Sequence, residues 1–183
     1  MSRLEERTIN TEKIFTGKVI TLQVEDVELP NGKTSKREII KHPGAVAVLA
    51  VTEDNKIVMV EQYRKALDKI IAEIPAGKLE AGEEPRVCAE RELEEETGYG
   101  CTEMEWLISF YTSPGFADEL VHLYIAKGLM KKENAASPDE DEFVNLMEVT
   151  LDEAISLLKQ QRIYDAKTAY AIQYLQLQEA QKK

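Results

Sequence analysis

The unbroken apolar segment at residues 45–51 constrains the fold of this chain more than any other feature. It opens a β-type run that extends to residue 52, and a second β-type run at residues 57–63 follows a polar turn at residues 53–56. A strand that is apolar on both faces must be covered on both sides. We therefore expect these two runs to form a buried pair of strands at the centre of a sheet.

The other patterns indicate more strands and three helices around this pair. Helices are expected at residues 84–97, from the capping-box pattern at Thr150 onward, and from about Asp165. The first of them has Pro85 in its opening turn and Gly98 as its stop. Further strands are expected at residues 69–74, 104–111, 120–126 and 143–149. Mixed strands with few helices and no regular βαβ alternation indicate an α+β sandwich.

Residues 1–43 are predicted to form a separate β layer ahead of a larger domain at residues 44–183. Apolar and polar residues alternate at residues 20–24, and a turn at residues 30–33 leads to a returning strand at residues 35–41. A two-stranded hairpin alone is only marginally stable in water. We expect two such layers to pair across a twofold axis in a homodimer. The alternative is that the hairpin folds back on its own sandwich.

Charge and composition exclude several classes of protein. The 183 residues include 23 Lys plus Arg and 34 Asp plus Glu, a formal net charge of -11. Nucleic acid and anionic membranes are therefore not expected as partners, and an anionic substrate would need cations. Cys88 and Cys101 are too few for a disulfide scaffold or a zinc cluster and are expected as buried or free thiols. Because we find neither a membrane-spanning run nor a signal-peptide core, we expect a cytoplasmic protein.

The expected helix at residues 84–97 has an unusual charge distribution. Residues 80–96 include eight acidic side chains and two basic ones. Glu92 and Glu96 lie one turn apart on the same face, where like charges repel. Carboxylate oxygens are the ligands that Mg²⁺ and Mn²⁺ prefer, so a bound cation would relieve this repulsion. The alternative is an ordinary solvated acidic face.

The spacing around this helix favours the metal site. Five residues separate Gly77 from Glu83, seven more separate Glu83 from Arg91, and residues 92–99 continue as Glu-Leu-Glu-Glu-Glu-Thr-Gly-Tyr. This segment resembles the Nudix box, Gly-x5-Glu-x7-Arg-Glu-U-x-Glu-Glu-x-Gly-U, in which U is a bulky apolar residue. Tyr99 departs from the aliphatic residue more common at its position. Gly77 is expected to let the chain turn from strand to loop without a side-chain penalty.

The resemblance implies a Nudix fold, an α/β/α sandwich with a mixed sheet, next to the N-terminal β layer. In the Nudix family, the positions of Glu92 and Glu96 bind metal, and a backbone carbonyl at the position of Ala76 adds a ligand. These residues are expected to hold Mg²⁺, with Mn²⁺ as the alternative. Two roles stay open for Glu95: a second metal or base role, or a salt bridge with Arg91.

Three segments resemble the ADP-ribose pyrophosphatase branch of the family. They are Ser-Pro-Gly at residues 113–115, followed by a glutamate four residues later; Glu-Gln-Tyr-Arg at residues 61–64; and Arg-Glu-Ile-Ile-Lys-His-Pro-Gly at residues 37–44. In that branch, the arginine of the second segment contacts a substrate phosphate. The third segment reaches the adenine, often across a dimer. His42 has no acidic neighbour and is expected to be structural. The expected substrate-binding residues are Arg37, Glu38, Arg64, Ser113, Pro114, Gly115 and Glu119.

The acidic segment at residues 137–143 reads as a solvated loop by composition alone. In the ADP-ribose pyrophosphatase branch, however, a loop in this place carries a glutamate that acts as general base on the attacking water. This chain has four consecutive acids there, and we choose Glu142 first and Glu140 second, because both alternate to the same side of an extended segment. Glu95 is the next candidate for the base.

The resemblance implies that the protein hydrolyses ADP-ribose to AMP and ribose 5-phosphate. One alternative is another nucleoside diphosphate sugar such as GDP-mannose, because the diphosphate machinery does not contact the sugar. A second alternative, a module that senses a nucleotide without cleaving it, would need a damaged box, and every catalytic-type carboxylate is present here.

Overall fold

The computed structural model describes residues 4–133 and 143–182. The chain forms two compact units. Unit 1 consists of Met1–Gly44 and Phe110–Leu120, and unit 2 consists of Ala45–Ser109 and Val121–Lys183. None of the helices in the described part of the chain has the length and apolarity needed to cross a membrane.

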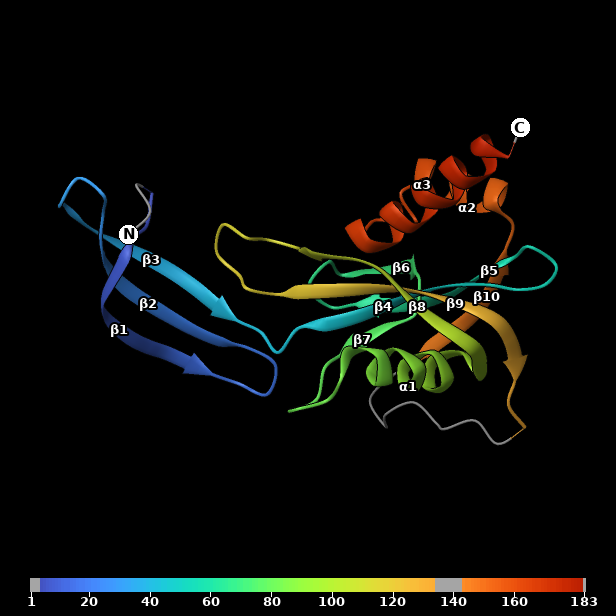
Figure 1. Ribbon diagram of the computed structural model, residues 1–183, viewed down its shortest axis with the longest axis horizontal. Coiled ribbons are helices and arrows are strands. Elements are labelled where there is room, and N and C mark those ends of the chain that lie inside the picture. The colour runs from blue at the N-terminus through green and yellow to red at the C-terminus, as the bar shows by residue number, and fades with distance from the viewer. Residues whose placement is uncertain (1–3, 134–142, 183) are drawn as a thin grey trace. The chain divides into compact units, whose positions relative to one another are not determined.

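Unit 1 contains an antiparallel sheet of three strands in the order β1-β2-β3 (Figure 1). The strands are β1 (Arg7–Thr16), β2 (Thr21–Glu28) and β3 (Thr34–Lys41). The hairpin β2-β3 was expected from the sequence, but β1 was not. Its pairing with β2 has two register irregularities, and its apolar residues Ile9, Ile14 and Phe15 do not alternate with a period of two.

The segment at residues 110–120 is attached to the end of β3. Ile40 forms a parallel bridge with Ala117, and its amide donates to the carbonyl of Phe116 over 2.7 Å. The amide of Asp118 donates to the carbonyl of Ile40 over 3.1 Å, and Lys41 forms an ion pair with the Asp118 carboxylate. No local pattern in the sequence indicated that this segment belongs with the N-terminal strands.

The sheet of unit 2 is mixed, with β10-β5-β4-β9-β8 as its main order. Strand β4 runs antiparallel to β5 and parallel to β9; β6 pairs with β5, and β7 pairs with β4. The bounds are β4 (Ala45–Val51), β5 (Ile57–Arg64), β6 (Lys69–Glu73), β7 (Ala76–Lys78), β8 (Tyr99–Tyr111), β9 (Leu120–Lys131) and β10 (Val144–Val149). The expected buried pair, β4 and β5, is confirmed at the centre. Strands β8 and β9 are each five residues longer than predicted.

Three helices cover this sheet: α1 (Pro85–Thr97) on one face, and α2 (Leu151–Lys159) and α3 (Ala166–Gln181) on the other (Figure 1). All three begin within one residue of the predicted positions. Helix α1 ends on Gly98 in the left-handed conformation, and Thr150 caps α2 in a complete capping box. The predicted α+β fold with a mixed sheet between helical layers is confirmed.

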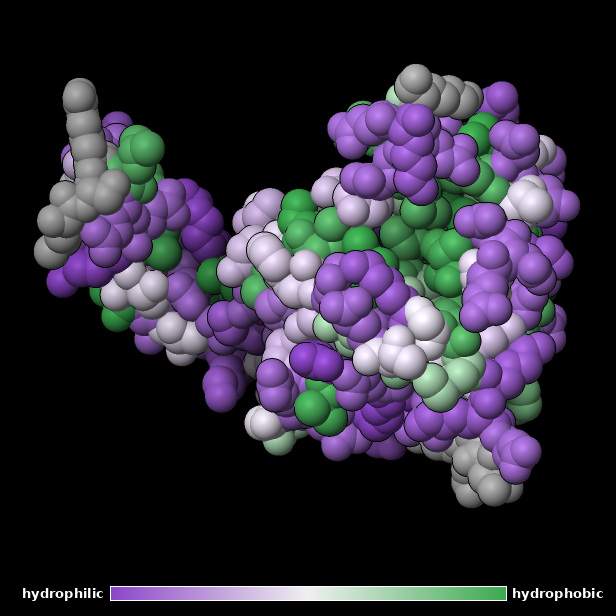
Figure 2. Space-filling model, turned by 45° about the vertical axis from the view of Figure 1, so that its right-hand side comes forward, coloured by the Kyte–Doolittle hydropathy of each residue, from purple (hydrophilic) through white to green (hydrophobic). Residues whose placement is uncertain are grey.

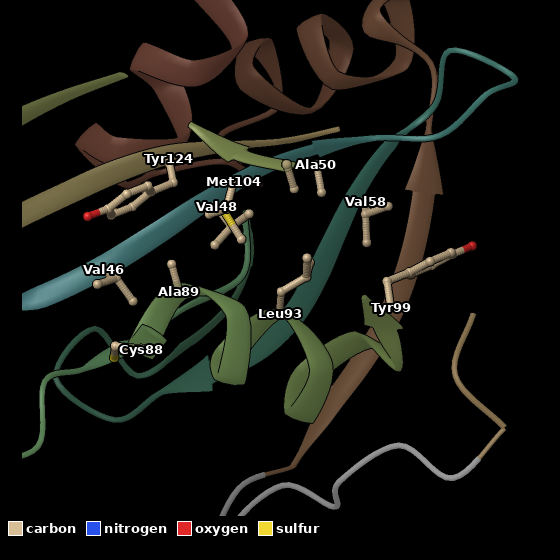
Figure 3. Close-up of a cluster of buried hydrophobic side chains, with 11 residues drawn as sticks. Val46, Val48, Ala50, Val58, Cys88, Ala89, Leu93, Tyr99, Met104 and Tyr124 are labelled. Carbon is tan, nitrogen blue, oxygen red and sulfur yellow. The ribbon is translucent and has the colours of Figure 1, made fainter. Parts of the chain in front are cut away.

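The core beneath α1 holds the helix against the central strands. Leu93 and Ala89 of α1 are fully buried against Val46 and Val48 of β4 (Figure 3). The thiol of Cys88 is buried in the same cluster and is free, as expected. This packing fixes which face of α1 remains for polar side chains.

Three hydrogen-bonded side chains connect β8 and β9. The indole Nε1 of Trp106 donates to the Ser109 hydroxyl over 2.9 Å, and that hydroxyl lies 2.7 Å from Nδ1 of His122. The Trp106 side chain itself is 61% exposed.

Candidate active site

The polar face of α1 carries two buried carboxylates. Glu92 and Glu96 are 7% and 6% exposed. The amide of Ala76 donates to Oε2 of Glu96 over 3.0 Å, and the Glu92 carboxylate lies against the backbone of Gly77. The structure thus brings together Ala76, Glu92 and Glu96, the three predicted metal ligands.

Gly77 is required for a reason that differs from the expectation. Its backbone is not in the positive-φ region, so turning freedom is not what the position needs. A Cβ atom built on Gly77 would lie 1.8 Å from Cδ of Glu92. The Glu92 carboxylate occupies the space that a side chain at position 77 would fill.

The donor set at this place suits a hard cation. Two carboxylates one helical turn apart, next to a strand that can offer a backbone carbonyl, supply the oxygen ligands that Mg²⁺ and Mn²⁺ prefer. Across the described residues, no three His, Cys, Asp or Glu side chains are grouped to hold a metal ion. The carboxylate pair therefore needs other oxygen donors, such as a backbone carbonyl, water or substrate.

Arg91 links three of the acidic side chains. Its guanidinium donates to Glu83 from Nε (3.0 Å) and Nη2 (3.1 Å), and from Nη1 to Glu92 (2.9 Å) and Glu95 (2.8 Å). The hydrogen bonds from Arg91 lower the pKa of Glu83 to about 2. Of the two roles left open for Glu95, the structure shows the salt bridge, and a role as base remains a prediction.

Tyr99, the departure from the box pattern, has a polar partner. Its ring is buried in the core beneath α1 (Figure 3), and its hydroxyl donates to Oε1 of Glu148 on β10 over 2.6 Å. Burial, together with this bond, raises the pKa of Tyr99 to about 12. The residue therefore ties the end of α1 to the edge of the sheet.

Arg64, at the end of β5, is held by a residue that sequence reasoning missed. Its Nε donates over 2.6 Å to Oε2 of Glu73, whose side chain is 4% exposed. Burial opposes the charge of Arg64, but Glu73 raises its pKa, and the charges of Glu96 and Asp165 add to that effect. Arg64 thus lies within the electrostatic reach of Glu96, one of the two carboxylates on α1. The sequence feature that could have indicated Glu73 is its place directly after the apolar residues Ile-Ile-Ala in an expected strand.

The predicted adenine-binding residues belong to unit 1. Arg37 on β3 is engaged by Glu6, with Nε to Oε2 at 2.8 Å and Nη2 to Oε1 at 2.5 Å. Glu38 is exposed, and as the next residue on the strand it points to the opposite face. Arg37 and Glu38 therefore do not project together from one face of β3.

The loop with the Ser-Pro-Gly motif also belongs to unit 1. Ser113 accepts hydrogen bonds at its carbonyl from the amides of Phe116 and Ala117, which closes the turn through Pro114 and Gly115. The Thr112 hydroxyl donates to Glu119 over 2.5 Å. The four predicted substrate-binding residues of this loop, Ser113, Pro114, Gly115 and Glu119, therefore belong to one hydrogen-bonded turn and the residues next to it.

His42 has an acidic partner that its sequence neighbours do not supply. The amide of Gly44 donates to Nδ1 of His42 over 3.1 Å, which leaves the hydrogen of the neutral ring on Nε2. That atom lies 3.8 Å from Oε1 of Glu119, 77 residues along the chain. The inference that no acid lies near His42 was wrong, because the contact is tertiary.

The predicted bases Glu142 and Glu140 lie outside the described residues.

The family model described as the NUDIX domain matches residues 41–171, which includes the whole box and both sides of the central sheet. The chain belongs to the Nudix family of hydrolases. Nudix hydrolases generally use divalent metal ions, which agrees with the oxygen donors of Glu92 and Glu96.

Relatives of this Nudix protein match it over nearly their full length. A protein named methanol dehydrogenase activator from Bacillus methanolicus is 74% identical over 178 residues, 97% of this chain and 96% of its own. An ADP-ribose pyrophosphatase from Bacillus subtilis (strain 168) is 64% identical over 180 residues, 98% and 97% of the two chains. A GDP-mannose pyrophosphatase from Escherichia coli O9:H4 (strain HS) is 32% identical over 184 residues, 94% and 96%.

A solved structure of the same fold has the description "Crystal structure of ADP compounds hydrolase". It superimposes with a TM-score of 0.84 and covers 97% of this chain and 96% of its own, at 19% sequence identity. At that identity, the match shows the Nudix fold and not the substrate.

Proposed function

We propose that this Nudix hydrolase cleaves the diphosphate of ADP-ribose to AMP and ribose 5-phosphate, with Mg²⁺ as its metal, in the cytoplasm. The observation that carries the proposal is the 64% identity, over 98% of the chain, to a relative named ADP-ribose pyrophosphatase. The intact carboxylate pair on α1 supports catalysis over nucleotide sensing, because both side chains are buried at the place where a cation is needed.

Glu92, Glu96 and the carbonyl of Ala76 would hold the metal, which when bound neutralises the diphosphate and polarises it toward attack. Arg64 would bind a phosphate oxygen with its guanidinium fork. Glu142, or else Glu140, would take a proton from the attacking water. The water oxygen then bonds to one phosphorus, the bridging P–O bond breaks, and the other phosphate leaves with the electron pair.

The experiment is product analysis on a panel of ADP-ribose and GDP-mannose, with magnesium and with chelator. We expect AMP and ribose 5-phosphate from ADP-ribose in magnesium alone. Glu92→Gln and Glu96→Gln should each lower kcat/KM by at least about a hundredfold. The matched control is Glu90→Gln, because Glu90 lies on the same helix but is exposed and paired with Arg86. Equal turnover in all three variants would contradict the metal site, and preferred cleavage of GDP-mannose would contradict the substrate.

The choice of base is tested separately. Glu142→Gln should lower kcat far more than it raises KM, because a general base acts in the transition state. A large loss in Glu140→Gln alone would reverse our order within the loop. If neither substitution lowers kcat, the base lies elsewhere, with Glu95 next.

The proposed assembly is a homodimer in which unit 1 packs against the partner. The proposed adenine contact comes from β3, through Arg37 from one face of the strand or through Glu38 from the other. All ten residues of β1 are exposed, among them Ile9, Ile14 and Phe15 at more than half of their surface. Figure 2 shows that hydrophobic residues, in green, are present among hydrophilic ones on the visible surface. The dimer is contradicted if sedimentation gives a particle of 20.7 kDa, the mass of one chain, and the protein is fully active under the same conditions. Mixing Arg37→Ala with Glu92→Gln subunits should restore part of the activity if the site is shared.

A second candidate function rests on the 74% identity to a protein named methanol dehydrogenase activator. We propose that the chain also raises the rate of a methanol dehydrogenase. The test adds wild-type or Glu96→Gln protein to a purified methanol dehydrogenase and follows methanol oxidation. No rate increase with wild type contradicts this function. An increase that Glu96→Gln retains separates the activation from hydrolysis.

A further inference from the structure

A stretch of four residues, 73–76, positions two charged groups of the site at once. At its beginning, the Glu73 carboxylate accepts from Nε of Arg64 over 2.6 Å. At its end, the amide of Ala76 donates to the Glu96 carboxylate over 3.0 Å. The guanidinium and the metal-site carboxylate are therefore held by parts of the chain three residues apart.

The backbone of this stretch is fixed to its neighbours on both sides. The amide of Ile74 donates to the Thr168 hydroxyl of α3 over 3.0 Å, in a buried bond. The carbonyl of Pro75 accepts from the amide of Val48 on β4 over 2.8 Å. Because the stretch is tied to α3 and to the central strand, the positions of Glu73 and Ala76 are set by the fold of unit 2.

Glu73 is a buried acid with two cationic partners. Its Oε2 binds Arg64, and its Oε1 lies 2.5 Å from Nζ of Lys167, whose side chain is 15% exposed. Lys167 also contacts Asp165 over 2.9 Å. Burying a carboxylate is costly unless it is paired and hydrogen-bonded. Lys167 supplies this compensation from the side of the carboxylate that Arg64 does not use.

The bond to Glu73 uses one nitrogen of Arg64. Within the described part of the chain, the Arg64 side chain makes its hydrogen bond through Nε, so both terminal amino groups are left for a ligand. A guanidinium presents its donors in a fixed plane, and anchoring Nε therefore orients the two remaining nitrogens. Its side chain is 39% exposed, which gives a ligand access.

We propose that Glu73 is a positioning residue, which holds the Arg64 guanidinium so that its two terminal amino groups bind the substrate diphosphate beside Glu96. This inference rests on the proposed function. Glu73 acts through Arg64 and does not touch the substrate. Loss of the Glu73 carboxylate therefore weakens diphosphate binding while Arg64 is present and has little effect when Arg64 is absent.

The test is a double-mutant cycle on binding. The probe is an ADP-ribose analogue in which a methylene group replaces the bridging oxygen of the diphosphate, titrated by calorimetry in magnesium. Glu73→Gln should raise the Kd about tenfold, the range of a charged hydrogen bond. In an Arg64→Ala background, the same substitution should change the Kd by less than about twofold. In hydrolysis, Glu73→Gln should raise KM more than it lowers kcat.

The matched control is Lys167→Met, which perturbs the same carboxylate from its other side. It should lower the unfolding temperature but change the Kd by less than about twofold. If Glu73→Gln does not fold, Glu73→Asp replaces it, because aspartate keeps the charge beside Lys167 and is one methylene shorter toward Arg64.

Two results overturn the inference: equal weakening by Glu73→Gln in both backgrounds, or no weakening in either. If the wild type is active and either of these results is found, the positioning role of Glu73 is contradicted but the proposed function is not. A wild type that neither binds the analogue nor hydrolyses ADP-ribose contradicts the proposed function, and the role of Glu73 falls with it.

Discussion

The two units solve the problem of stability in different ways. In unit 2, the central strand β4 has five consecutive buried residues, and helices cover the sheet on both faces. In unit 1, Val27 is the single buried apolar side chain of the described strands β1, β2 and β3. Burial of apolar surface dominates the free energy of folding, so unit 2 carries most of the stability of the chain. Unit 1 keeps exposed apolar side chains, such as Ile9, Ile14 and Phe15, that could contact a partner.

Two ion pairs, one from each unit, differ in burial in the same way. In unit 1, the side chains of the Arg7–Glu28 pair are 66% and 40% exposed. In unit 2, those of the Lys167–Glu73 pair are 15% and 4% exposed. Exposed pairs contribute little, whereas removing one partner of a buried pair leaves an uncompensated charge. The Lys167–Glu73 pair is therefore expected to matter for the stability of unit 2, whereas the Arg7–Glu28 pair of unit 1 is replaceable.

The largest expected loss of stability comes from creating a cavity in the core of unit 2. Leu93→Ala should lower the free energy of unfolding by about 2–5 kcal/mol, because Leu93 is fully buried between α1 and the sheet. Ile14→Ala in β1 should cost less than about 0.5 kcal/mol in the monomer, because Ile14 is 52% exposed. Urea unfolding of both variants makes the comparison, and equal losses would contradict the division of stability between the units.

A smaller effect concerns acid pH. The pKa of Glu83 is about 2 in the folded chain against an ordinary value of 4.5, so its pairing with Arg91 stabilises the fold above pH 4.5. This contribution disappears as the pH falls through about 2. The unfolding temperature of Arg91→Met should lie below that of wild type at neutral pH, and the gap should narrow from pH 4.5 toward 2. A gap that stays constant over this range would show that Glu83 is not the group responsible.

The smallest effect is expected for the exposed pair of unit 1. Arg7→Ala should change the free energy of unfolding by less than about 1 kcal/mol, and added salt should remove the difference. Lys167→Met serves as the comparison in unit 2 and should cost more at every salt concentration. A larger loss in Arg7→Ala would mean that the exposed sheet contributes to stability through contacts that its monomer does not show.

The sequence was sufficient for features encoded within a few residues. The apolar run of β4, Pro85 and Gly98 at the ends of α1, and the capping box at Thr150 each act locally, and each was predicted in place. The box spacing was likewise enough to identify the family, because its residues lie close together in the sequence, on helix α1 and the segments next to it. Local chemistry thus accounts for most elements of unit 2.

Features that depend on distant partners were missed. Glu73 is explained by Arg64 and by Lys167, which is 94 residues away, and the partner of His42 is Glu119. The need for glycine at position 77 follows from the approach of Glu92, which no backbone rule indicates. Such contacts require knowledge of which strands and helices are neighbours, and one sequence does not contain it in readable form.

The hydrogen-bonded indole on β8 also determines how this protein can be observed in solution. Trp106 is the single tryptophan of the chain and is mostly exposed, so we expect its fluorescence to have a water-like emission wavelength already in the native state. Unfolding will therefore shift that wavelength little, and circular dichroism is the better probe of stability. The exposed ring is instead suited to quenching by a neutral solute such as acrylamide. Because Trp106 is alone, any change in that quenching on ligand addition reports on one known position in β8.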